Sequence, residues 1–154
     1  NVNLATIYRP LNNFFINPFM EHLRKKYICQ NQIKKGLAGV KESINYLKNN
    51  FSVALMIDQR VSEGKRLPFF EHMALTTTLP AQMALKFNLD IVPIYIARKK
   101  NDNFQIEIYN PLKITNKDDN ETNKLNISIK LNKILEEMIS RDPGLWIWTH
   151  NRWK

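Results

Sequence analysis

Apolar runs and polar breaks alternate along the chain, and their periods predict an alternation of strands and helices. Short β-branched runs indicate buried strands, whereas apolar residues three or four apart indicate helices that bury one face. The predicted strands are residues 4–8, 52–57, 91–97 and 104–109, the last two forming a hairpin. The predicted helices are residues 17–27, 40–49 and 79–88, and a long one through 127–138 that Pro143-Gly144 ends. This order predicts an α/β fold with a mixed, largely parallel central sheet flanked by helices.

The segments between these elements contain start signals and two long connections. Asn17 before Pro18 is predicted to cap the first helix, and the Thr76-Thr77-Thr78 run offers capping hydroxyls to the third. Residues 61–78 are predicted to be a long irregular loop, and residues 116–122 a polar one. Long loops in compact domains are often functional, so residues 61–78 are a candidate part of a functional site.

Composition adds a strong positive charge to this pattern. The 154 residues include 23 Lys and Arg against 14 Asp and Glu, a net charge of +9. Such a field favours nucleic acid, phosphorylated substrates or an anionic membrane surface, and charge alone does not choose among them. The single Cys29 excludes an internal disulfide framework. No segment approaches the roughly 20 apolar residues that span a bilayer.

Several common kinds of site have no sequence support. His22, His72 and His150 are far apart and lack the spacing of a metal site, so no metal is predicted. The chain has neither a glycine-rich phosphate loop nor a GxSxG motif. Nucleotide binding and serine hydrolysis are therefore unsupported, and no cofactor is predicted.

Polar residues follow two of the predicted strands. Tyr8-Arg9-Pro10 places a guanidinium at a sheet edge, where it could bind phosphate or carboxylate or simply close the strand at the surface. Asp58 and Gln59 follow the apolar run 52–57, at the strand end where ligands gather in open α/β sheets. Asp58 could equally cap a turn, and both interpretations stay open.

Aromatic residues lie beside cations in two places. Phe69 and Phe70 follow a Lys-Arg pair, and they could line an apolar groove or fill the core. The tail 145–154 contains all three Trp residues, with His150 and Arg152 between them. Trp suits a membrane interface, so the tail could hold an anionic lipid, pack on the sheet, or do both.

The order of these motifs resembles the lauroyl/myristoyl acyltransferases of lipid A biosynthesis. This family is part of the larger group of glycerol-phosphate and lysophospholipid acyltransferases. The resembling segments, in chain order, are Tyr8-Arg9-Pro10-Leu11-Asn12-Asn13, Asp58-Gln59, Gly64 with Pro68-Phe69-Phe70, Ala74, Thr76, Pro93 and Trp146-Ile147-Trp148-Thr149-His150-Asn151-Arg152-Trp153-Lys154. The tail is the most specific of them, and the Tyr-Arg-Pro-x-Asn-Asn corner is the second.

The resemblance implies an enzyme of lipopolysaccharide biosynthesis at the cytoplasmic face of the inner membrane. It would transfer a fatty acyl group from acyl carrier protein to a hydroxyl of a lipid A precursor. The implied partners are acyl carrier protein, that precursor and the anionic inner membrane, without nucleic acid. Arg9 is the residue expected to bind substrate phosphate or support the transition state. The implied substrate-binding residues are Arg9, Asp58, Gln59, Phe69, Phe70, His150 and Arg152.

One departure from the family limits what this chain is expected to do alone. The family uses His as a general base in an HxxxxD/E motif, but Tyr27 follows His22 at that spacing and Thr77 follows His72. In the family this motif and a membrane helix precede the Tyr-Arg corner. We therefore expect residues 1–154 to be the C-terminal part of a single acyltransferase domain, a fragment inactive by itself. The alternatives are a non-catalytic basic lipid-binding remnant and a nucleic-acid-binding module, which lacks any recognition signature here.

Overall fold

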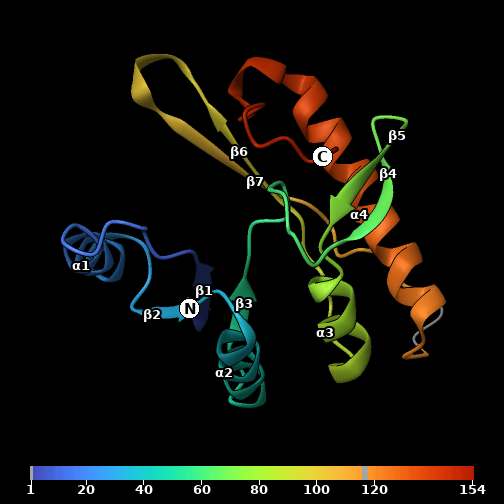
Figure 1. The fold of residues 1–154 in the computed structure, drawn as a ribbon, viewed down its shortest axis with the longest axis horizontal. Helices are drawn as coiled ribbons and strands as arrows, with labels where there is room; N and C mark the ends of the chain where they lie inside the picture. The colour runs from blue at the N-terminus through green and yellow to red at the C-terminus, as the bar shows by residue number, and fades with distance from the viewer. Residues whose placement is uncertain (1, 116–117) are drawn as a thin grey trace. The chain divides into compact units, whose positions relative to one another are not determined.

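The protein is described by a computed structural model that covers residues 2–115 and 118–154 (Figure 1). The chain divides into two compact units, Asn1–Met56 and Ile57–Lys154. Both units contain helices and strands, and the predicted α/β fold is confirmed. The prediction of a single domain stays a prediction.

The first unit is built on a parallel sheet with the strand order β2-β1-β3. Its central strand is β1 (Leu4–Tyr8), which pairs with β2 (Asn31–Lys34) on one side and with β3 (Ser52–Ala54) on the other. Helices α1 (Asn17–Tyr27) and α2 (Leu37–Lys48) make the two crossover connections that parallel strands require.

Helix α2 packs against all three strands of this sheet. Ala5 in β1 and Ile33 in β2 are completely buried. Gly39 permits the close packing, because a Cβ there would lie 1.9 Å from the Lys34 carbonyl oxygen. A side chain at this position would therefore separate the helix from the sheet.

One strand of this unit was missed, and another was predicted to be longer than it is. β2 was not predicted, because Ile33 is its only apolar residue and one buried side chain gives no readable period. β3 was predicted over 52–57, but its pairing with β1 ends at Ala54. The prediction was too long because the apolar run continues past the last paired residue. Met56, in that continuation, is 70% exposed.

The second unit is organised around the long helix α4 (Glu121–Arg141). The antiparallel hairpin of β4 (Lys65–Phe69) and β5 (His72–Thr76) packs on α4, as does α3 (Leu79–Phe87) (Figure 1). A second antiparallel hairpin contains β6 (Ile94–Arg98) and β7 (Phe104–Ile108). Short 3-10 turns, η1 (Lys100–Asp102) and η2 (Pro143–Leu145), lie at the tip of the second hairpin and after α4.

The apolar face of α4 joins two core clusters. The residues of this face recur three or four apart, which confirms the predicted helix. One cluster contains Phe69, Ala74, Leu135 and Ile139, and the other contains Ala81, Leu85, Ile127 and Leu131. The helix begins at Glu121, earlier than predicted, because the Asn120 side chain accepts a hydrogen bond from the Asn123 N–H. Residues 116 and 117 of the predicted polar loop lie outside the described residues.

The predicted irregular loop over residues 61–78 was wrong, since it contains β4 and β5. Leu67 and Phe69 are buried at alternate positions of β4, as a half-buried strand requires. Pro68 concealed this pattern, although proline is tolerated where its missing N–H is not needed by a neighbouring strand. The turn Phe70-Glu71 contains neither Gly nor Asn, the residues that usually indicate a hairpin turn in a sequence.

Candidate functional site

Arg9 is exposed directly after β1, and the residue before it, Tyr8, is bonded to a carboxylate of α1. The Tyr8 hydroxyl donates to Glu21 Oε1 at 2.7 Å, and the Asn17 side-chain amide donates to the same oxygen at 2.8 Å. Burial, together with the Glu21 hydrogen bond, raises the pKa of Tyr8 to about 12. Those two donors, with Lys34 nearby, lower the pKa of Glu21. The hydrogen bond from Tyr8 to the Glu21 carboxylate therefore holds the end of β1, next to Arg9, against α1.

The turn before α1 is held by the second Asn of the Tyr-Arg-Pro-x-Asn-Asn corner. Asn13 Oδ1 accepts the N–H groups of Phe15 and Ile16, at 3.0 and 3.2 Å. Asn17 was predicted to cap the helix, which is wrong: the N-cap is Ile16, without a side-chain cap. Asn17 Oδ1 instead accepts the Leu11 N–H at 2.8 Å, because the chain bends back over the helix start.

Asp58 and Gln59 lie at the beginning of the second unit. Gln59 is exposed, whereas Asp58 is half-buried and its Oδ1 has no hydrogen-bond partner among the described residues. Because that oxygen accepts no hydrogen bond within the described part of the chain, it does not support the alternative prediction that Asp58 caps a turn. The Asp58 charge acts on Arg152, whose pKa it raises against the larger effect of burial.

Arg152 is the most deeply placed charged side chain of the described residues, with no exposed surface. Its Nη2 donates to Thr76 Oγ1 at 3.1 Å and to Asn132 Oδ1 at 3.2 Å. Its guanidinium carbon lies 4.0 Å from the centroid of the Phe69 ring. Its Nε and Nη1 are buried without a hydrogen-bond partner in the described part of the chain. Burial lowers the pKa of Arg152, while Asp58 and Glu136 partly oppose that shift.

This guanidinium anchors the tail to the β4–β5 hairpin. The Arg152 carbonyl accepts the Leu75 N–H at 2.9 Å, which extends the backbone pairing beyond β5. Asn132 on α4 donates to the Pro68 carbonyl at 2.8 Å and completes the polar cluster. Since Arg152 is enclosed, a direct contact with substrate would require the tail to move, and its predicted substrate-binding role stays a prediction.

The tail aromatics close over Phe69. Its ring centroid lies 5.8 Å from that of Trp146 and 5.7 Å from that of Trp153. Phe69 is completely buried and Phe70 half-buried, so Phe69 fills the core in this structure. His150 is exposed at the outer side of the tail. Of the two interpretations of the tail, packing is therefore observed, and lipid contact stays a prediction.

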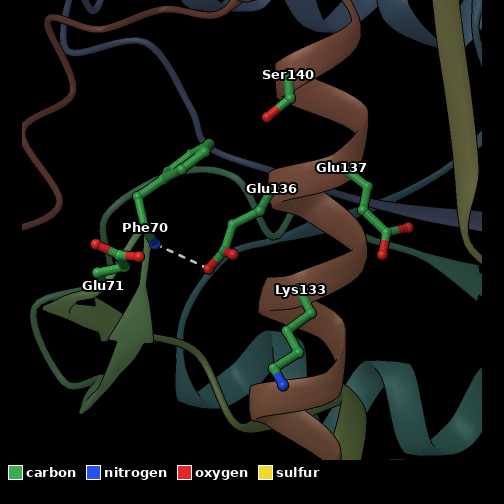
Figure 2. Close-up of a pocket in the computed structure, with 6 residues that line it drawn as sticks. All are labelled: Phe70, Glu71, Lys133, Glu136, Glu137 and Ser140. Carbon is green, nitrogen blue, oxygen red and sulfur yellow. Dashed lines mark hydrogen bonds between the residues drawn. The ribbon is translucent and has the colours of Figure 1, made fainter.

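A hollow of about 560 Å³ lies beside the β4–β5 turn (Figure 2). Figure 2 shows the Phe70 backbone N–H donating to the Glu136 carboxylate, at 2.8 Å. Glu71 and Glu137 add two more carboxylates, against the single cation of Lys133. Because this lining is net negative, it does not suit a phosphorylated substrate.

The structure brings some predicted residues together, and the predicted residues belong to both of the chain's units. Phe69, Phe70 and Arg152 share one cluster, with the Asp58 charge acting on it. Arg9 belongs to the first unit. Asn132 was not predicted to belong to the site, and its signal in the sequence is a polar residue on the buried face of α4.

No group of three or more His, Cys, Asp or Glu residues in the described ranges could hold a metal ion. Within the same ranges, every helix is too short or too polar to cross a bilayer.

Comparison with known proteins identifies the family. The model of the bacterial lipid A biosynthesis acyltransferase family matches residues 1–154, the full length given. The chain therefore belongs to this family, as the motif order indicated. The comparison with curated proteins finds no match.

Proposed function

We propose that this chain supplies the substrate-side part of an acyltransferase that acts in lipopolysaccharide biosynthesis. The reaction transfers a fatty acyl group from acyl carrier protein to a hydroxyl of a lipid A precursor, at the cytoplasmic face of the inner membrane. The observation that carries the proposal is the family match over all 154 residues. The net charge of +9 supports it, because the precursor phosphates, acyl carrier protein and the inner membrane are all anionic.

The general base of this reaction is not among these residues, since the sequence contains no HxxxxD/E motif. The chain's own groups would bind and orient the acceptor. Arg9 is the best placed of them, because it is exposed at the end of β1 and has a planar guanidinium that matches a phosphate. The fixed Tyr8–Glu21 pair beside it holds the strand end in place.

Binding of the acceptor by the 154-residue chain tests this proposal without requiring turnover. We expect the chain to bind a bis-phosphorylated lipid A precursor more tightly than the dephosphorylated form of that molecule. Arg9→Ala should remove most of the difference between the two, whereas Arg66→Ala, which removes an exposed cation of β4, should retain it.

A nucleic-acid partner is the outcome that would overturn the proposal. Tight, salt-sensitive binding to an RNA or DNA oligomer, together with no preference for the phosphorylated precursor, would show that the charge serves nucleic acid. If the chain bound the two forms of the precursor with equal affinity, the proposed contact between Arg9 and a phosphate would be wrong.

A further inference from the structure

Large apolar side chains gather in the open at the turn that leads into α1. Phe14 and Phe15 are 84% and 89% exposed, Ile16 is 49% exposed, and Phe19 is 60% exposed. The Phe14 and Phe15 rings contact each other edge to face, with centroids 6.0 Å apart. Single exposed apolar residues need no explanation, but four within six residues form a patch that normally marks an interaction site.

Hydrogen bonds hold this turn in its shape. Asn13 Oδ1 accepts the N–H groups of Phe15 and Ile16, and Asn17 Oδ1 accepts the Leu11 N–H. The Asn17 amide is in turn bonded to Glu21, which α1 presents to Tyr8. The exposure of the two rings therefore results from a hydrogen-bonded turn and not from a frayed end.

Positive charge lies at the far end of the helix that follows the patch. The last turn of α1 contains Arg24, Lys25 and Lys26, without an acidic residue in its first turn. Phe19 and Lys26 fall at positions i and i+7 of α1, so one side of the helix runs from aromatic to basic, and Phe15 lies in the turn before it. The whole first unit contains eight Lys and Arg against two Glu, which gives +6 of the chain's net +9.

We propose that this surface, defined as Phe14, Phe15, Ile16 and Phe19 with Lys25 and Lys26, docks on an anionic lipid bilayer. The aromatic rings would enter the boundary between headgroups and acyl chains, and the lysines would meet the headgroup phosphates. At 11 residues α1 is too short to span a bilayer, so the contact is interfacial. The proposal deepens the membrane location in the proposed function and rests on it, but its test requires no acyl transfer.

A second exposed apolar surface provides the contrast. The outer face of the β6–β7 hairpin presents Ile94, Ile96, Phe104, Ile106 and Ile108. It belongs to a unit with fifteen Lys and Arg against twelve Asp and Glu, and this net charge of +3, against +6 in the first unit, makes that unit less complementary to an anionic bilayer. The bilayer is therefore assigned to the α1 surface, and the hairpin face serves as a matched control.

Vesicle co-sedimentation of the 154-residue chain tests the assignment. We expect binding to vesicles of equal parts phosphatidylglycerol and phosphatidylcholine, and little binding to phosphatidylcholine alone. The Phe14→Ser/Phe15→Ser/Phe19→Ser variant should bind at least about tenfold more weakly, since it removes the inserted rings. Lys25→Gln and Lys26→Gln should each weaken binding about fivefold. All of these side chains are exposed, so circular dichroism and the unfolding midpoint should stay unchanged.

The control variant is Ile96→Ser/Ile106→Ser/Ile108→Ser, which removes as many apolar groups from the hairpin face. It should bind phosphatidylglycerol vesicles as the parent does. Equal loss in both triple variants, or parental binding by the Phe variant, would overturn the assignment. If the Phe variant instead abolishes a dimer in analytical ultracentrifugation and retains vesicle binding, the surface covers a second copy and the proposal is wrong.

Discussion

At the scale of single residues, Arg9 and Arg152 differ in burial, and this difference indicates different roles for the two guanidinium groups. Arg9 is exposed at a strand end, whereas Arg152 is enclosed between Phe69, Thr76 and Asn132. The sequence supported a ligand contact for both, because each stands in a motif of the family. Burial of Arg152 was not predictable, since its partners lie 76 and 20 residues away in the chain.

Replacement of Arg152 tests whether its role is structural. Arg152→Ala should lower the free energy of unfolding by about 3 kcal/mol, because it leaves a cavity below Phe69 and removes the partner of buried polar groups. Arg152→Met should cost less, because its side chain fills most of the space below Phe69, although Thr76 and Asn132 still lose their partner. Urea denaturation measures both.

The Met variant also separates structure from substrate binding. If Arg152 serves only the fold, Arg152→Met should bind the phosphorylated precursor as the parent does. A stable Met variant that has lost the preference for phosphate would contradict this and would confirm the sequence-based assignment.

Glu21 predicts a dependence of stability on pH. Its pKa is lowered in the folded protein by hydrogen bonds from Tyr8 and Asn17, so its contribution is present above its unfolded value of about 4.3. The contribution is lost as the pH falls through the lower, folded value. Urea unfolding between pH 7 and pH 3 should show that Glu21→Gln loses less stability on acidification than the parent.

Glu42→Gln is the matched control, because it removes the other carboxylate of the first unit from an exposed position in α2. It should follow the parent's decline with pH. A Glu21→Gln curve that runs parallel to the parent's would show that the Tyr8–Glu21–Asn17 contacts do not depend on that charge.

At the scale of elements, the helices and the strands β1, β6 and β7 were predictable, whereas β2, β4 and β5 were not. The apolar stripe of α4 repeats from Ile127 to Ile139, so its period is visible without knowledge of the fold. β2 buries only Ile33, and β4 contains Pro68, so neither gives a clear period of two. Their existence depends on pairing with β1 and β5, which lie elsewhere in the sequence.

The β4–β5 turn predicts a stabilising substitution. Phe70 and Glu71 have φ values of 47° and 63°, a left-handed conformation that costs most residues about 1–2 kcal/mol each. Two-residue hairpin turns of this type favour glycine at the second position. Glu71→Gly should therefore raise the free energy of unfolding by about 1 kcal/mol in urea denaturation.

Glu71→Ala provides the control for this prediction, because it removes the same exposed carboxylate and retains the left-handed penalty. It should give little or no gain. A gain equal to that of the glycine variant would place the effect in the repulsion between Glu71 and the neighbouring Glu136 and Glu137, and not in the backbone.

At the scale of the whole molecule, chemistry and charge are distributed unequally. The first unit has +6 of the net +9, together with Arg9 and the exposed aromatic turn. The family match implies an acyltransferase, while the sequence contains no HxxxxD/E motif to provide a base. We therefore expect the 154-residue chain alone to show no acyl transfer from acyl carrier protein to a lipid A precursor.

Acyl transfer after joining the HxxxxD/E segment of another family member to residues 1–154 tests the central claim most directly. The joined protein should move a labelled fatty acyl group from acyl carrier protein to the precursor. Arg9→Ala should lower the rate about a hundredfold, while Arg66→Ala leaves it unchanged. A folded joined protein that transfers no acyl group, or one whose rate is indifferent to Arg9, would contradict the account.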